Sequence, residues 1–312
     1  MIPSKYVLGK RIALWGVISG FLLAGVALAQ SDPPKSANPA KRPAPAARRV
    51  TTPPLAQVSI EEALQLTKKA PKDPNAYLAL GGAYRRAGRT QEAVDAFKKV
   101  TVLDPNGSTG HVSLGAAYMD LKRPDDAERE FRKALKLNTN DPAAHFNMGN
   151  FYLSKGRRDD ALSEFRRATE LQPPIADAWV SLSLVQAELG KTDEATQGYK
   201  KALAIDSTNV RALTNLANAQ YAQGKIPEAT SLYRKALKYD PRNQEANYNM
   251  GVAFADAQIF KQALSYWKYV VAVDSTTNIA ESAKSSIQIL EDFLSQQSKA
   301  SQPPPTGATQ KQ

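Results

Sequence analysis

Apolar and small residues recur along this chain at two spacings, one inside helices and one between them. Within a helix, side chains three, four and seven positions apart share a face, as His145, Met148 and Tyr152 do. From position 74 onward an alanine also returns at one constant interval, at Ala93, Ala127, Ala161, Ala195, Ala229 and Ala263. An aromatic residue follows each alanine by four positions, at Phe97, Phe131, Phe165, Tyr199, Tyr233 and Trp267. The pattern predicts six consecutive helix pairs without insertions or deletions.

The third of these repeats resembles the tetratricopeptide repeat most fully. It carries His145, Met148-Gly149, Tyr152, Ala161, Phe165, Ala168 and Pro173 at that family's positions. The resemblance covers residues 74–275 and implies an all-α, right-handed α-solenoid of about six helix pairs with flanking capping helices. The six repeats span residues 74–107, 108–141, 142–175, 176–209, 210–243 and 244–277. Gln186 and Gln220 replace the family's tyrosine, which predicts looser packing in repeats four and five.

Helix ends and caps are also marked in the sequence. Gly156, Gly190 and Gly224 are placed to end first helices, because glycine suits helix C-caps. Residues 59–73 begin with a Ser59–Glu62 capping box and predict an N-terminal capping helix. Residues 278–296 predict a C-terminal capping helix that turns apolar residues inward, and residues 297–312 a polar, disordered tail.

The N-terminal segment, 1–58, differs in composition from the repeats. Residues 1–29 have a basic start, an apolar run and a small-residue site at Ala29, as a secretory signal peptide has. Residues 12–29 are also long enough for an uncleaved membrane anchor. Residues 30–58 predict a Pro/Ala-rich disordered linker. Residues 1–58 hold eight Lys/Arg against one acid, a net of 8 − 1 = +7 of the chain's +11, so the body is nearly neutral. We expect a periplasmic or secreted protein, or one anchored to the inner membrane and facing the periplasm.

Polar side chains in the first helices point away from the predicted seam. On a helical wheel, Asn147 and Asn150 fall about 150° from the seam centre, in what the resemblance implies is a concave groove. The predicted groove residues are Asn147, Asn150, Asn215, Asn218 and Asn249 with Phe146, Tyr221 and Tyr248. The row resembles the asparagine ladder of O-linked N-acetylglucosamine transferases. Side-chain amides pair with the backbone of an extended peptide, which predicts a peptide or protein partner; alternatively, these asparagines are solvated surface residues.

Nothing in the residue pattern favours catalysis. The chain has no cysteine, and the pattern lacks a P-loop or nucleophile elbow. His111 and His145 occupy equivalent seam positions, where packing is favoured over metal binding. Asp125-Asp126 and Asp159-Asp160 begin second helices, where carboxylates favour the helix dipole. We therefore expect no catalytic residue, cofactor or metal.

The predicted function is a non-enzymatic scaffold or adaptor of the bacterial envelope, with no specific nucleic-acid partner. One alternative is an accessory subunit of an envelope enzyme complex for polysaccharide export or glycosyl transfer. The other is a binder of envelope polymers or nucleic acid through the basic linker.

Overall fold

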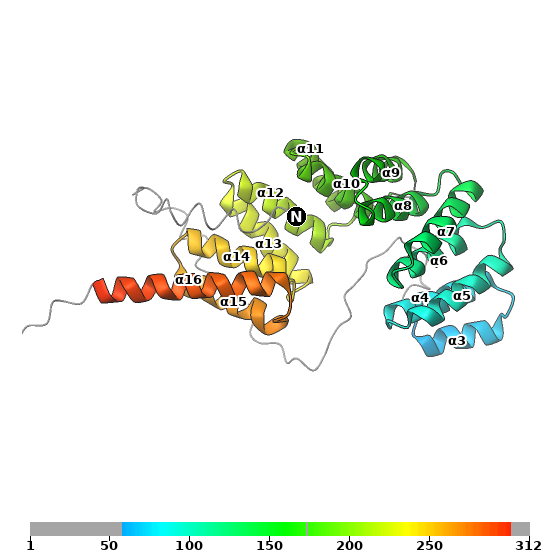
Figure 1. Cartoon of the computed structure of the whole chain (residues 1–312), viewed down its shortest axis with the longest axis horizontal. Helices are drawn as coiled ribbons and strands as arrows, with labels where there is room; N and C mark the ends of the chain where they lie inside the picture. Colours follow the sequence, from blue (N-terminus) through cyan, green and yellow to red (C-terminus); the bar gives the residue numbers. More distant parts are fainter. Residues whose placement is uncertain (1–57, 173, 301–312) are drawn as a thin grey trace, which may run out of the picture. The chain divides into compact units, whose positions relative to one another are not determined.

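The computed structural model describes residues 58–172 and 174–300, which form fourteen helices in two compact bodies (Figure 1). The N-terminal body, up to Ser207, contains α3 (Ile60–Lys69), α4 (Pro74–Arg86), α5 (Thr90–Leu103), α6 (Ser108–Asp120), α7 (Pro124–Leu137), α8 (Pro142–Ser154), α9 (Arg158–Glu170), α10 (Ala176–Glu188) and α11 (Thr192–Ile205). The C-terminal body, from Thr208, contains α12 (Val210–Ala222), α13 (Ile226–Tyr239), α14 (Gln244–Asp256), α15 (Phe260–Val273) and α16 (Asn278–Ala300). The predicted signal peptide, most of the linker and the tail beyond residue 300 lie outside the described residues.

Successive helices pack in pairs, α4 with α5, α6 with α7, and so on to α14 with α15. The all-α solenoid fold predicted from the repeat period is confirmed. First helices begin at Pro74, Ser108, Pro142, Ala176, Val210 and Gln244, at the same constant interval as the alanines. Within the described residues, no helix is both long enough and apolar enough to span a membrane.

A left-handed residue follows the first helix of every repeat, beginning with Gly88 in repeat one at a φ of 74°. Gly156, Gly190 and Gly224 have φ of 73°, 77° and 78°, which confirms their predicted role. Lys122 and Gln258 hold the same position in repeats two and six with φ of 57° and 62°. A side chain there carries the left-handed strain that glycine avoids, so these two turns are less well matched to their residues than the glycine turns.

The seam inside several helix pairs is closed by an aromatic ring against a residue without a side chain. A Cβ added to Gly149 would lie 2.6 Å from Cε1 of Phe165. Phe165 has no exposed surface, and Gly115 meets Phe131 in the same way. Glycine in the middle of a first helix lowers the helix propensity of that segment, but it lets the second helix approach closely. The large buried ring supplies the packing that offsets this loss.

Capping helices close the ends of the repeats. On α3, the Ser59 side chain accepts from the Glu62 N–H while Glu62 accepts from the Ser59 N–H, which confirms the capping box. At the other end α16 packs against α14 and α15. Its N-terminal cap is Thr277, whose hydroxyl accepts from the Ala280 N–H, and the helix extends to Ala300, past the predicted end at residue 296.

Candidate functional site

The polar face of α8 carries the predicted site residues Asn147 and Asn150. Both side chains are half-buried, and their spacing of three places them one turn apart on the same side of the helix. The Asn147 side-chain amide donates to the Ala143 carbonyl oxygen at 2.8 Å, which fixes its orientation. Within the described residues, Asn150 makes no side-chain hydrogen bond. This turn of α8 therefore presents one oriented amide and one unused amide to solvent.

The residues around this pair are small or apolar. Ser113 occupies the position of Asn147 in α6 and is half-buried, whereas its counterpart in α10, Ser181, is buried. Leu153, three residues after Asn150, is half-buried and packs against the core of the N-terminal body. We call the surface formed by Ser113, Asn147, Asn150 and Leu153 the amide face. It offers amide groups and apolar contact without a formal charge.

Phe146 belongs more to the core than to this surface. Its ring is half-buried, and its centroid lies 5.9 Å from that of Phe165. A tilted pair at this separation is a favourable aromatic contact inside the seam. Phe146 therefore packs α8 against the second helix of its repeat, and the exposed part of its half-buried ring remains for a ligand.

The C-terminal body arranges its asparagines differently. The Oδ1 atom of Asn218 accepts from the Tyr233 hydroxyl at 2.6 Å and from Nδ2 of Asn249 at 2.8 Å. Its Nδ2 atom donates to Glu245 Oε1 at 3.0 Å. Burial of Tyr233, with the nearby charge of Glu245, raises the pKa of its hydroxyl, so Tyr233 stays a neutral donor. Asn218 and Asn249 thus form a structural cluster in which Asn218 accepts two hydrogen bonds and donates one, and Asn249 donates one.

Two of the remaining predicted residues are held by this body itself. Tyr248, predicted to line the groove, is 9% exposed, and its hydroxyl lies 3.2 Å from Ser286 Oγ on α16. The capping helix covers it. The Tyr221 hydroxyl donates to the Asp256 carboxylate. Asn215 is half-buried and makes no side-chain hydrogen bond within the described residues.

The eight predicted residues therefore do not form a single row in the structure. Phe146, Asn147 and Asn150 lie on the N-terminal body, and the other five lie on the C-terminal body. The side chains of the two sets therefore have different neighbours. Of the eight, Asn150 and Asn215 make no side-chain hydrogen bond within the described residues, and Asn147 makes one, to the backbone of its own helix.

Sequence reasoning missed two histidine–glutamate pairs in the N-terminal body. Nδ1 of His111 lies 2.6 Å from Glu130 Oε2, and Nδ1 of His145 lies 2.6 Å from Glu164 Oε2. The two residues of each pair are 19 positions apart, so the pairing links the first and second helix of one repeat. In the first repeat the corresponding positions hold Tyr77 and Ala96, so the residue pair at this seam position differs between repeats. Across the described chain, no group of three or more His, Cys, Asp or Glu is arranged to hold a metal ion.

Fold and surfaces together define a tetratricopeptide repeat protein, a class whose helix pairs present surfaces to protein partners. The chain belongs to the family described as the cilia and flagella-associated protein 70 C-terminal domain, which matches residues 27–285. Among curated proteins, none matches the chain.

Several solved structures share the fold. The pilF protein of Pseudomonas aeruginosa superposes with a TM-score of 0.59 at 20% identity, over 73% of this chain and 99% of that one. The Cut9–Hcn1 hetero-tetramer of the APC/C gives 0.64 at 14% identity, over 73% and 45%. PilW, a type IV pilus biogenesis factor, gives 0.54 at 20% identity, over 67% and 97%. At these identities the likeness establishes the fold alone.

Proposed function

We propose that the chain is a non-enzymatic adaptor that binds an extended segment of a partner protein on the amide face of the N-terminal body. The observation that carries this proposal is the pair Asn147 and Asn150. One amide is held in place by its own helix, and the other is unused and half-exposed. An oriented amide oxygen beside a free amide group matches the alternating N–H and C=O groups of an extended backbone.

The energetics suit a moderate, sequence-tolerant interaction. Each amide-to-backbone hydrogen bond contributes a net of roughly 0.5–1.5 kcal/mol. Two such bonds therefore account for about 1–3 kcal/mol, or roughly 5- to 150-fold in affinity. Apolar contact with Leu153 and the outer edge of Phe146 adds to this. The helices are already formed, so the ordering cost of binding falls mainly on the partner.

The proposal is tested by selecting 12-residue peptides from a random library on the full chain and measuring their affinities by fluorescence anisotropy. We expect the double variant Asn147→Ala/Asn150→Ala to weaken the selected peptides by 5-fold or more. Asn106→Ala is the matched control, because Asn106 is an exposed asparagine in the loop between α5 and α6. Peptides that bind the double variant as tightly as the parent chain would place the site elsewhere.

The composition of the N-terminal segment bears on where in the cell the protein is located. Its basic start, apolar run and Ala29 site favour export, with the repeats on the far side of the membrane. The family description refers instead to cilia and flagella, which favours a partner in such a structure. N-terminal sequencing of the protein isolated from its own cells separates the two. A new terminus at Gln30 supports export, and an intact Met1 on a chain that co-sediments with cilia or flagella contradicts it.

A second candidate, polymer or nucleic-acid binding through the basic linker, is favoured by residues 31–58, which hold five Lys/Arg against one acid. Deleting residues 31–58 distinguishes it from the amide face. Retained peptide binding with lost binding to heparin, used as a model polyanion, assigns the two activities to separate parts of the chain.

A further inference from the structure

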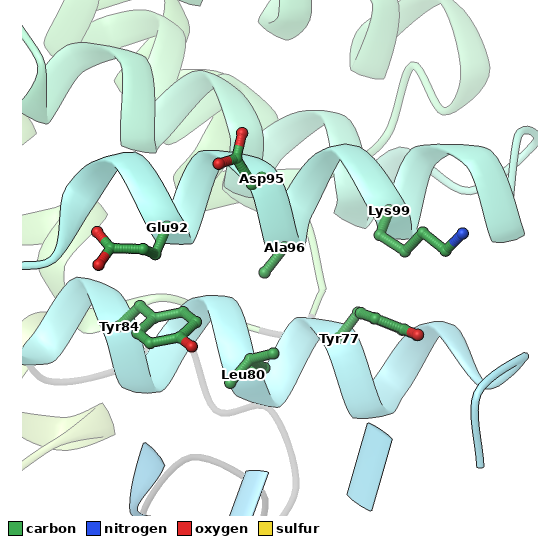
Figure 2. Close-up of a pocket in the computed structure, with 7 residues that line it drawn as sticks. All are labelled: Tyr77, Leu80, Tyr84, Glu92, Asp95, Ala96 and Lys99. Carbon is green, nitrogen blue, oxygen red and sulfur yellow. The ribbon is translucent and has the colours of Figure 1, made fainter. Parts of the chain in front are cut away.

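An open hollow lies between α4 and α5 at the beginning of the N-terminal body (Figure 2). Its volume is about 370 Å³, within the roughly 300–1,000 Å³ of small ligand sites. The α4 wall consists of Tyr77, Leu80 and Tyr84, spaced three and four residues apart. The two half-buried tyrosine rings stand on either side of Leu80. This wall is therefore aromatic and apolar, with a polar tip on each ring.

A short side chain on α5 leaves room for this hollow. The central residue of the α5 wall, Ala96, is buried and short, whereas Glu130 and Glu164 occupy the same position in the next two repeats and reach their histidines. Glu92, Asp95 and Lys99 line the hollow, and Glu92 is paired with Arg89, so acidic and basic groups balance around it. A strongly acidic or basic occupant therefore gains no net electrostatic advantage, and a neutral apolar one is favoured.

The chain itself enters the N-terminal body beside this hollow. The Val58 carbonyl oxygen accepts from Nη2 of Arg86 at 2.7 Å, which ties the entry point to the end of α4. Val58 also packs against a core cluster that includes Leu80 and Ala96, two residues that line the hollow. The segment that precedes Val58 is therefore tethered next to the Tyr84 end.

The composition of residues 50–57 suits the aromatic and apolar wall of the hollow. Their sequence, VTTPPLAQ, has no charge, two consecutive prolines and Leu55. Proline-rich segments favour the polyproline II conformation, which rises about 3.1 Å per residue and docks in aromatic-lined grooves. Tyr84 and Tyr77 are seven residues apart on α4, about 10 Å along the helix axis. Three or four residues of polyproline II span that distance, which is enough for Pro53 and Pro54 to reach Tyr77.

We propose that this hollow is the docking site of the chain's own residues 50–57, with Pro53 and Pro54 packed against the two tyrosine rings. A segment tethered this closely has an effective concentration in the millimolar range, so a weak intrinsic affinity is enough to keep it bound. Docking covers the hollow between α4 and α5 and fixes the direction in which the N-terminal segment leaves the body. It also keeps unrelated proline-rich peptides out of the hollow.

Cysteine cross-linking in the full chain tests this directly, because the natural sequence has no cysteine. Thr52→Cys is combined with Lys99→Cys, which lines the hollow at the Tyr77 end. The matched control combines Thr52→Cys with Lys98→Cys, since Lys98 is the adjacent exposed residue and does not line the hollow. We expect the intramolecular disulfide to form at least tenfold faster with Lys99→Cys. Adding Ala96→Leu, which fills the hollow, is expected to abolish the difference.

Three outcomes overturn the proposal. Equal rates at the two positions show that residues 50–57 do not dock. Disulfide-linked dimers in place of the intramolecular product show that a second copy occupies the hollow. A rate difference that persists in the Ala96→Leu chain, with its helix content unchanged by circular dichroism, shows that the contact lies outside the hollow.

Discussion

Raising the pH is expected to destabilise the third repeat through His145. Nδ1 of this imidazole lies 2.6 Å from Glu164 Oε2, and its Nε2 lies 3.0 Å from the Thr139 carbonyl oxygen. A carbonyl oxygen and an ionised carboxylate only accept hydrogen bonds. Both contacts are hydrogen bonds at the same time only when both ring nitrogens carry a proton. The geometry therefore favours the imidazolium.

The direction of the pH effect follows from the pKa of His145. Burial acts to lower this pKa, but the hydrogen bonds to Glu164 and to the Thr139 carbonyl outweigh it and raise the pKa above its usual 6.5, although Arg167 opposes them weakly. A group whose pKa is raised in the folded state contributes stability that is fully present below its unfolded pKa. That contribution is lost as the pH rises through the folded pKa. The stabilisation is thus larger at pH 5.5 than at pH 8.5.

The magnitude is limited by solvent access. A hydrogen bond to a charged group contributes a net of roughly 1.5–3 kcal/mol when buried. The His145 and Glu164 side chains are 14% and 23% exposed, so we expect about 1–2 kcal/mol. The assay is urea unfolding of the parent chain and of His145→Gln at pH 5.5 and 8.5, because the variant lacks the titrating group. His111→Gln is the matched control, since within the described residues the His111 ring has a single hydrogen-bond partner, Glu130.

Ring titration by NMR gives the sharper result. The chain has two histidines, so in the His111→Gln variant the remaining imidazole signal belongs to His145. A titration midpoint above pH 6.5, which falls when Glu164→Gln is combined with His111→Gln, supports the assignment of this hydrogen bond. A midpoint at or below 6.5, or one that Glu164→Gln leaves unchanged, refutes it.

Three further stability predictions concern single positions, each measured by urea unfolding. Lys122→Gly should stabilise the chain by about 0.5–1 kcal/mol, because glycine adopts a φ of 57° without strain; a loss of stability would contradict that account of the turn. Gly149→Ala should cost about 1–3 kcal/mol, since the new Cβ lies 2.6 Å from the Phe165 ring. Gly82→Ala should gain up to about 1 kcal/mol, because the nearest atom to its Cβ is Nη1 of Arg86 at 3.5 Å. Asn218→Ala should cost about 1–3 kcal/mol, because it leaves a buried tyrosine hydroxyl unpaired, while Asn215→Ala should be nearly neutral; equal effects would mean that the cluster is not structural.

The periodic features of the fold could be predicted from the sequence because each has a local cause. Gly156 needs a left-handed backbone, and Gly149 needs space for Phe165; both requirements appear in the sequence as glycine at a fixed offset. The Ser59–Glu62 capping box is likewise a local hydrogen-bond pattern. Six repetitions of such signals leave little freedom in where the helices begin and end.

The candidate site was less predictable, because a helical wheel gives the direction of a side chain but not what covers it. The wheel directs Tyr248 away from its seam, yet its ring centroid lies 6.3 Å from that of Trp267 in the same repeat. In addition, α16 packs against its helix and Ser286 lies beside its hydroxyl. The Asn218 cluster had one usable signal: Tyr233 stands where the first three repeats have phenylalanine, and a buried hydroxyl needs a partner.

The seam positions carried a signal that only a comparison between repeats reveals. Where the first-helix position holds the large Trp179, the second helix holds Gly198; a Cβ there would make ordinary contact with the indole ring at 3.7 Å and would overlap the Ser183 hydroxyl. Where the first helix holds histidine, the second holds glutamate. Such complementary pairs, with one member on each helix of a repeat, predict contacts that helix periodicity alone does not.

The most direct test of the central claim is the NMR spectrum of the Asn147 and Asn150 side-chain amides during titration with a selected 12-residue peptide. The proposed function predicts that both NH₂ signals shift in proportion to bound peptide, with the larger change at Asn150, whose amide has no partner within the described residues. Saturating peptide that leaves both amide signals in place while signals elsewhere move would contradict it.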